Sequence, residues 1–367
     1  TVITGDYGLT AAAIARQVEI IKDDYVSVNG VEVEAMPQKE LMALLSTDKP
    51  VVFSRTTPQH KLKIVEAYKK LGEIVAVTGD GVNDILALRS AHIGIAMGKS
   101  GTDVARDAAD MILLDDNFST IVRAVEEGRG IYANIKKFMT YILASNVAEM
   151  VPVIAMGLFG IPPALTVLQI LAIDLGTDLL PALALGAERP EKGLLNQPPR
   201  KKTEALLDKK LLLRAYGFLG VIEAAVSMGL FLLSFALNGI GVGELVGLKD
   251  AIVNATASGE VLRIYAHATT MTLMGVIFCQ IGNVFACRSE TRPFYKSFAS
   301  ENKWIYIGIL AELAIALALV YVPFMQTIFD TAPLKGTDFL FLLACPIILL
   351  AFEEFRKLIV RKRKARI

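Results

Sequence analysis

The sequence has few cysteines, almost no net charge and no initiator methionine. Its three cysteines, Cys279, Cys287 and Cys345, lie in or beside apolar runs, at spacings that fit neither a zinc site nor a disulfide framework. The net charge of +1 indicates no class of partner, and nothing in the sequence suggests nucleic-acid binding. Because residue 1 already lies in a predicted strand, without a signal peptide before it, we expect the chain to be a piece of a longer protein.

Apolar residues, in contrast, are abundant and unevenly spread. They make up 53% of the 367 residues. Residues 1 to about 137 have the composition of a soluble α/β protein, whereas the remainder contains apolar runs of about 20 residues, the length that crosses a bilayer. The sequence therefore predicts a soluble α/β segment followed by an all-α transmembrane bundle of six helices. The six runs are residues 138–159, 164–187, 211–237, 266–286, 304–324 and 338–355.

Lys and Arg are concentrated in alternate connections between these runs. The basic segments are residues 188–210, 287–303 and 356–367, and the connections between them contain few basic residues. By the positive-inside rule, both ends of this chain face the cytoplasm, and the chain is a multi-pass protein of the lipid bilayer. We expect four parts: an α/β domain (1–116), a stalk helix (117–137), a transmembrane domain (138–359) and a basic cytoplasmic tail (360–367).

The α/β segment alternates short apolar runs with amphipathic helical patterns. The runs "TVIT", "PVVFSR", "EIVAVT" and "IGIAM" predict strands, and residues 101–114 predict a single helix. This alternation is typical of βαβ units and a parallel sheet. Thr-Gly-Asp turns at Thr4–Asp6 and Thr78–Asp80 follow two of the strands. We expect both turns on one edge of the sheet, where such sheets bind ligands.

The stretch "AVTGDGVNDILAL" contains a candidate metal site. Gly79 and Gly81 permit a tight turn, and Asp80, Asn83 and Asp84 follow the end of the strand. Mg²⁺ favours one or two carboxylates together with phosphate oxygens. The sequence therefore predicts a magnesium site at this strand end.

Two other segments of the α/β part have features of phosphate sites. Lys61 follows a strand and could reach a phosphate as a point charge. The segment "GIAMGKSGT" resembles a P-loop, but three residues rather than four separate Gly94 from Gly98. We interpret this segment as a loop between a strand and a helix.

The first two predicted spans each contain a cluster of acidic, amide or hydroxyl side chains. Asp174 and Asp178 lie four residues apart on one helix face, with Thr177 beside them, and Asn146 and Glu149 lie in the preceding span. An ionised side chain at the centre of a membrane helix costs about 2.5–3.5 kcal/mol, so such groups indicate an ion path, a proton relay or a buried ion pair. Oxygen ligands of this kind suit a hard cation. A protonated, hydrogen-bonded packing cluster is the alternative.

Four further polar residues lie within the predicted spans. Each alone could be a hydrogen-bonded core group, so they are weaker candidates than the acids above. They are Glu223, Gln280, Asn283 and Glu312.

These segments together resemble the P-type ATPases, in the type II branch of calcium pumps and sodium/potassium pumps. The soluble motifs are "TGDYGLTA", "RTTPQHKLKIV", "TGDGVND", "GIAMG" and "DDNFSTIV", and the membrane motifs are "SNVAE" and "IDLGTD". The resemblance covers nearly the whole chain. It implies that the soluble part is the C-terminal half of a haloacid-dehalogenase-like, Rossmann-like phosphorylation domain. The six spans would be the family's fifth to tenth transmembrane helices.

The resemblance implies an ATP-driven cation pump of the plasma membrane that uses Mg²⁺ and ATP. Each candidate residue then has an expected role. Thr4 and Lys61 would contact the phosphoryl group, Asp80 would bind Mg²⁺, and Asn83 and Asp84 would support that site. The residues near the nucleotide would be Thr4, Gly5, Asp6, Arg55 and Lys61. The residues that coordinate the transported cation would be Asn146, Glu149, Asp174, Thr177, Asp178, Gln280 and Glu312.

Several parts of the family's pattern are absent from this sequence. The phosphorylated aspartate of the Asp-Lys-Thr-Gly-Thr motif, the actuator domain, the first four spans and most of the nucleotide domain do not occur. We therefore expect this chain alone to be inactive, and its partner to be the N-terminal part of the same pump. One alternative is a catalytically incomplete half-pump that acts only as a membrane subunit. Another is a lipid flippase of the same superfamily, against which the membrane acids argue.

The ligand set leaves the transported ion open. Asp174 stands where calcium pumps have Asn, which favours the sodium/potassium branch. Ala144 and Asn283, however, replace oxygen-rich or acidic residues expected in that branch. Na⁺ and Ca²⁺ are the leading candidates, and a proton is a further one.

Overall fold

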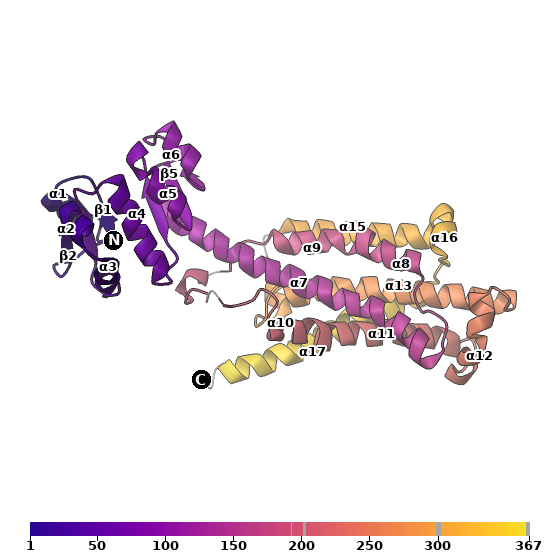
Figure 1. Ribbon diagram of the computed structural model, residues 1–367. Helices are drawn as coiled ribbons and strands as arrows, with labels where there is room; N and C mark the ends of the chain where they lie inside the picture. The colour runs from indigo at the N-terminus through magenta and orange to yellow at the C-terminus, as the bar shows by residue number, and fades with distance from the viewer. Residues whose placement is uncertain (192, 201–202, 299–301, 365–367) are drawn as a thin grey trace. The chain divides into compact units, whose positions relative to one another are not determined.

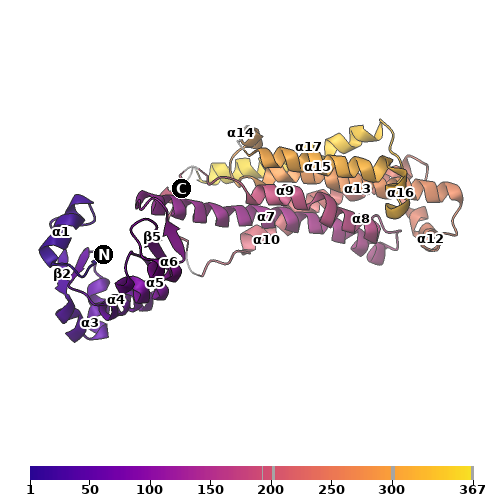
Figure 2. The same cartoon turned by 90° about the horizontal axis from the view of Figure 1, so that it is seen from above.

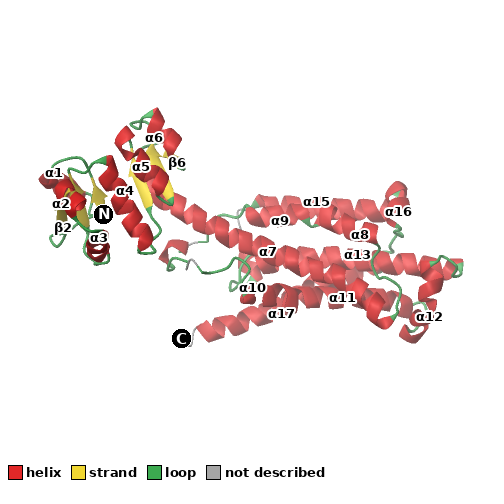
Figure 3. Cartoon of the chain, viewed as in Figure 1, coloured by secondary structure: helices red, strands yellow, loops and turns green. Residues whose placement is uncertain are grey.

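The computed structural model describes residues 1–191, 193–200, 203–298 and 302–364. The chain forms two compact units, Thr1–Ala124 and Val125–Ile367. Among the described residues, strands occur only in the first unit, as Figure 3 shows. Residues 365–367 of the predicted basic tail lie outside the described residues, as do Lys192, Lys201 and Lys202 of the first basic loop.

The first unit contains six short parallel strands in two sheets. One sheet has the order β1-β3-β2 and the other has the order β4-β5-β6. Ile3 lies opposite Phe53 in the first sheet, and Thr78 lies opposite Ile95 in the second. The strands are β1 (Val2–Ile3), β2 (Val26–Asn29), β3 (Val51–Ser54), β4 (Ala76–Gly79), β5 (Ile93–Met97) and β6 (Met111–Leu113).

Short helices connect these strands. In α4, Pro58 occupies the first turn and the Thr57 side chain accepts the N–H of His60, which fixes the start of the helix. Lys61 is thereby held in the first turn, close to the end of β3. The helices are α1 (Gly8–Gln17), α2 (Gly30–Ala35), α3 (Gln38–Leu45), α4 (Pro58–Lys70), the 3₁₀ turn η1 (Val82–Asp84), α5 (Ile85–Ser90) and α6 (Asp103–Ala108).

The structure corrects two sequence predictions in this unit. The two Thr-Gly-Asp turns follow β1 and β4, which belong to different sheets, because β1 pairs with β3 and β4 pairs with β5. Residues 101–114 do not form a single helix. The chain becomes extended at Ala109, and residues 111–113 then pair with β5 as β6.

The regular elements of the second unit are all helical in its described residues, and its long helices lie side by side (Figures 1 and 2). The N-terminal end of α7 belongs to the first unit, because the boundary lies between Ala124 and Val125. The segments are α7 (Ser119–Phe159), α8 (Val167–Ala172), the π turn η2 (Ile173–Thr177), α9 (Leu179–Gly186), the 3₁₀ turn η3 (Leu194–Asn196), α10 (Lys209–Arg214), the π turn η4 (Ala215–Leu219), α11 (Gly220–Ala236), α12 (Val242–Val253), α13 (Gly259–Cys287), α14 (Phe294–Phe298), α15 (Lys303–Tyr321), α16 (Pro323–Phe329) and α17 (Asp338–Lys364).

Five helical segments in the described part of the chain are long and apolar enough to cross a membrane. They correspond to the first five predicted spans, three of which extend beyond the helical segment by one to three residues at an end. The sixth predicted span is helical, in α17, but Asp338, Glu353 and Glu354 interrupt its apolar character. Helix α13 is the most enclosed, with 94% of its apolar stretch buried in the unit. It packs against α11, α15 and α17 and therefore forms the centre of the bundle.

Candidate functional site

Lys61 and Asp84 form a nearly buried ion pair in the first unit. The Lys61 Nζ lies 2.5 Å from Oδ1 of Asp84, and the two side chains are only 14% and 10% exposed. The other carboxylate oxygen of Asp84 accepts the N–H groups of Asp80 and Gly81, each at 3.3 Å. The structure thus brings together three of the predicted phosphate-site residues: Lys61, Asp80 and Asp84.

Gly79 is required for this arrangement because of the space it leaves. A Cβ atom at Gly79 would lie 2.4 Å from Cβ of Asp84. Any larger residue would therefore displace the Asp84 carboxylate from the turn. The sequence predicted a tight turn here, but only the structure shows that the contact partner of Gly79 is Asp84.

Asp80 and Asn83 are exposed, in contrast to Asp84. The backbone of Asp80 is fixed, because its carbonyl accepts the N–H of Thr102 at 2.8 Å. An exposed carboxylate on a fixed strand end fits Mg²⁺, which uses one or two carboxylates and takes phosphate oxygens as further ligands. Among the described residues, no group of three or more His, Cys, Asp and Glu side chains could hold a metal ion alone. A magnesium ion at Asp80 would therefore need ligands from a phosphate or from other residues.

Thr4, Asp6 and Arg55 form a second cluster, at the ends of β1 and β3. The Thr4 hydroxyl accepts the N–H of Asp6 at 3.1 Å, and the N–H of Arg55 donates to the Asp6 carbonyl at 3.0 Å. Arg55 has a left-handed backbone, with φ of 51°, and its guanidinium lies 5.0 Å from the centre of the Tyr7 ring. Gly5, Asp6 and Arg55 are all exposed, as a nucleotide contact would require. This cluster lies on the first sheet, whereas Asp80 follows the second.

A carboxylate of the same chain occupies the glycine-containing loop between β5 and α6. The N–H groups of Gly98, Lys99 and Ser100 donate to Asp116 at 2.7 to 2.9 Å. These bonds, led by that of Lys99, lower the pKa of the partly exposed Asp116 carboxyl to about 2. The prediction that this segment connects a strand and a helix through a loop is confirmed, and Asp116 occupies the backbone donors that a phosphate would use in a P-loop.

A second group of candidate residues lies in and around the π turn η2. Asp174 and Thr177 belong to this turn, and the N–H of Asp178 donates to the Ile173 carbonyl, five residues earlier, at 2.9 Å. Turns of this type occur frequently at functional sites. Pro181 has no N–H, so the Thr177 carbonyl lacks its usual helical donor. The segment therefore offers backbone oxygen as well as side-chain oxygen.

The acids around this turn differ in burial. Glu149 and Asp178 are buried, whereas Asn146 is partly exposed and Asp174 is exposed. Oε1 of Glu149 and Oδ1 of Asp178 are buried without a hydrogen-bond partner. Glu149, Asp174 and Asp178 lie close enough to interact electrostatically. Adjacent carboxyl groups with unpartnered oxygens within a membrane-type bundle require protons or a cation.

Gln280 and Glu312 approach the same acids from other helices. Gln280 is fully buried; its amide nitrogen donates to the Ser145 hydroxyl at 2.5 Å, and its oxygen accepts from Thr177 at 3.5 Å. Glu312 is also fully buried, and neither of its carboxylate oxygens has a hydrogen-bond partner. It interacts electrostatically with Asp178. The structure therefore places Gln280 and Glu312, two of the four weaker candidates, beside the acid cluster.

The sequence analysis did not single out Tyr141 or Ser145. The Tyr141 hydroxyl is buried without a hydrogen-bond partner and interacts electrostatically with Asp178 and Glu312. Tyr141, Ser145 and Glu149 are spaced by four residues and so share one face of α7. This spacing was the available signal, but hydroxyl groups in apolar runs attract less attention than acids.

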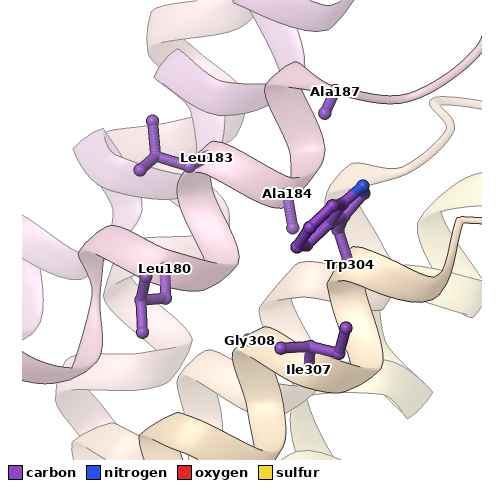
Figure 4. A pocket seen from close by; sticks show the side chains of 7 residues that line it. All are labelled: Leu180, Leu183, Ala184, Ala187, Trp304, Ile307 and Gly308. Carbon is purple, nitrogen blue, oxygen red and sulfur yellow. The ribbon is translucent and has the colours of Figure 1, made fainter.

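A pocket of about 330 Å³ between α9 and α15 is a different feature. Figure 4 shows that apolar side chains of the two helices line it. It contains no carboxylate and none of the predicted ligands. Its lining residues are Leu180, Leu183, Ala184, Ala187, Trp304, Ile307 and Gly308.

Comparison with known proteins matches each of the two units to a known family. Residues 162–359 match the family described as cation transporting ATPase, C-terminus, and residues 1–92 match haloacid dehalogenase-like hydrolases. The chain is 36% identical over 398 residues to sodium/potassium-transporting ATPase subunit alpha-4 of Rattus norvegicus, and 34% identical over 399 residues to subunit alpha-3 of Homo sapiens. Each alignment covers 98% of this chain but 39% of the relative, so the chain spans less than half the length of the relatives it matches. The chain therefore belongs to the type II P-type cation-transporting ATPases and corresponds to their C-terminal part.

Proposed function

We propose that this chain is the C-terminal part of an ATP-driven cation pump that works through an aspartyl phosphate. The observation that supports this most directly is the group of buried acids Glu149, Asp178 and Glu312, in which one oxygen of Glu149, one of Asp178 and both of Glu312 lack a hydrogen-bond partner. The relatives named as sodium/potassium-transporting ATPases support the same conclusion. The phosphorylated aspartate would come from a part of the protein outside this chain.

The first unit would contribute one side of the phosphorylation site. Phosphoryl transfer is accelerated mainly by positioning and by neutralising charge on the transferred group. The Lys61 ammonium, held by Asp84, would supply positive charge, and Asp80 would hold Mg²⁺, which neutralises phosphoryl oxygens when bound. Thr4 and Asn83 would bind the phosphate and support the metal site. Gly5, Asp6 and Arg55 would contact the nucleotide from the first sheet.

The two three-stranded sheets suggest how the N-terminal part of the pump would bind to the first unit. Strands β1 and β4 are both edge strands, each with one unpaired side. A strand from the N-terminal part that pairs with both would satisfy these edges and form one continuous sheet. Its carboxyl end would then lie between the Thr4 turn and the Asp80 turn, where a phosphorylated aspartate is needed.

The second unit would carry most of the cation site. Glu149, Thr177 and Asp178 face the interior, whereas Asp174 is exposed on the bundle. An exposed carboxylate within a span is costly in lipid, so we expect spans from the N-terminal part to cover Asp174 and complete the site. Asn146, Gln280 and Glu312 would add further oxygens. Both ends of this chain would face the cytoplasm at the plasma membrane.

The test is ion-stimulated phosphorylation of the intact protein by ATP. Because the relatives are named for sodium and potassium, Na⁺ is the first ion to test, and Ca²⁺ is the second. Asp178→Asn should abolish the stimulation and leave Mg²⁺ binding unchanged. Asp250→Asn, which changes an exposed acid in α12, is the matched control and should behave like the wild type. Wild-type protein that responds to neither ion would overturn the ion assignment, and an unaffected Asp178→Asn variant would remove Asp178 from the site.

A further inference from the structure

The loop between β5 and α6, residues 98–102, contacts the magnesium-site residue Asp80, and the proposed function assigns this loop no role. The N–H of Thr102 donates to the Asp80 carbonyl at 2.8 Å. The N–H of Asp80 donates to the Asp84 carboxylate at 3.3 Å. Both backbone polar groups of Asp80 are therefore held, one by Asp84 and the other by the loop. The direction of the exposed Asp80 side chain depends on both contacts.

Arg106 in α6 holds the two ends of this loop together. Its Nη1 donates to the carbonyl oxygen of Gly98 at 2.8 Å and to that of Gly101 at 2.7 Å. Its Nη2 pairs with the exposed Asp103. The Arg106 side chain is 30% exposed, so its bonds to the loop are partly shielded from water. Hydrogen bonds from a charged donor are about twice as strong as those between neutral groups.

Close packing leaves this loop little freedom to adopt another path. A Cβ atom at Gly98 would lie 2.7 Å from the carbonyl oxygen of Leu113, and a Cβ atom at Gly101 would overlap the carbonyl oxygen of Met97. The loop therefore folds tightly over the end of β5. Because Thr102 directly follows Gly101, a displacement of Gly101 also moves the N–H group that Asp80 accepts.

Two side chains of opposite charge bind the backbone of the loop. The Asp116 carboxylate accepts the N–H groups of residues 98–100. Among the described hydrogen bonds, only that of Arg106 links a side chain to Gly101. Asp116 thus holds the first part of the loop, and Arg106 holds the part next to Thr102.

We propose that Arg106 is a positioning residue for the magnesium site, which acts by holding the β5–α6 loop against the backbone of Asp80. The Arg106 guanidinium is a cation without an acceptor atom and does not bind Mg²⁺ itself. Groups that orient a metal ligand typically contribute 10–100-fold to metal affinity. Arg106 acts through one further contact, so we expect a contribution of about 10-fold. This inference rests on the proposed function, in which Asp80 binds Mg²⁺.

Arg106→Met tests the proposal in the intact protein, because it keeps an unbranched side chain and removes the donors. The measurement is the Mg²⁺ concentration that half-saturates phosphorylation by inorganic phosphate. In this reaction phosphate joins the aspartate carboxylate and water leaves, which reverses hydrolysis of the aspartyl phosphate, and no ATP is present to bind Mg²⁺. The variant should need about 10-fold more Mg²⁺. An unchanged Mg²⁺ requirement overturns the proposal.

Hydrogen exchange separates positioning from a general loss of structure. In Arg106→Met the amide of Thr102 should exchange faster than in the wild type, and the amides of β3 in the other sheet should not change. Faster exchange throughout the first unit would overturn the positioning role. If Arg106→Met folds poorly, Asp116→Asn replaces it, because it weakens the bonds on the other side of the same loop. A wild-type Mg²⁺ requirement in the variant that folds overturns the proposal.

Three further variants complete the test. Asp103→Asn is the matched control, because it removes the exposed ion pair of Arg106 and leaves the bonds to the loop, and it should behave like the wild type. Arg106→Lys keeps a charged donor for the two carbonyls and should restore the wild-type Mg²⁺ requirement; a defect equal to that of Arg106→Met would overturn the proposal. If Asp80→Asn loses Mg²⁺-dependent phosphorylation while Arg106→Met is normal, only this inference fails. If Asp80→Asn keeps the wild-type Mg²⁺ requirement, the proposed magnesium site fails.

Discussion

Removal of the Lys61–Asp84 ion pair should open the strand end that carries Asp80. Lys61→Met keeps most of the side-chain volume but leaves the Asp84 carboxylate nearly buried without its cation. Loss of one partner from a buried pair costs about 3–5 kcal/mol. The two side chains are still 14% and 10% exposed, and Asp84 keeps two backbone donors. We therefore expect a cost near the lower end of this range, about 3 kcal/mol.

Hydrogen exchange of the backbone amides in β4 and η1 measures this change directly. If these amides exchange through local opening, about 3 kcal/mol corresponds to exchange that is about 100-fold faster. Lys49→Met is the matched control, since it removes a Lys–Asp pair of 2.9 Å whose side chains are 54% and 75% exposed. That exposed pair should contribute at most about 1 kcal/mol. Equal exchange in the two variants would refute the argument that burial makes the Lys61–Asp84 pair strong.

Three other perturbations have defined outcomes. Gly79→Ala should accelerate exchange in β4 and η1 as Lys61→Met does, because its Cβ would meet Asp84 at 2.4 Å; unchanged exchange would contradict the predicted displacement. Asp116→Asn should lower the free energy of unfolding at neutral pH and make that free energy depend less on pH in the acid range. The pKa of the Asp116 carboxyl, about 2, lies below its ordinary value of 3.8. The ionised carboxylate therefore stabilises the wild-type fold fully above about pH 4, and this stabilisation is lost as the pH falls toward 2. Acid titration followed by circular dichroism checks this, and identical titration curves would count against it. Glu353→Gln leaves Arg214, 2.7 Å away, without its carboxylate and should destabilise the helical unit by about 3 kcal/mol. Thermal unfolding in detergent measures this loss, and an unchanged midpoint would show that the pair contributes little.

Much of the fold could be predicted from local patterns. The strands at residues 51–54, 76–79 and 93–97 and the long helix that contains Glu149 follow from periodicity and apolar length. The sheet arrangement could not be predicted, because pairing of β1 and β4 depends on strands far away in the sequence. Two strands, β2 and β6, were missed; β6 was missed because pairing with β5 overrides the helical preference of residues 109–113.

The residues of the candidate site also fall into those that the sequence indicates and those that only the structure indicates. Asp174 and Asp178 could be identified because acids are rare and costly in apolar runs. Tyr141 gained significance only from its neighbours. A hydroxyl group is ordinary in sequence, and the burial of this one beside Asp178 appears only when helices from different parts of the chain pack together.

By itself, the sequence determined that an α/β segment precedes an apolar helical segment, the strands β3, β4 and β5, and the residues with suitable chemistry, because these depend on local composition and spacing. The tertiary structure alone decided that Lys61 pairs with Asp84 and that Gly79 must be small. It also decided that the carboxyl group of Glu223 lies 3.5 Å from the amide nitrogen of Asn283 in α13. These relations depend on contacts between residues distant in the chain, and local periodicity does not specify such contacts.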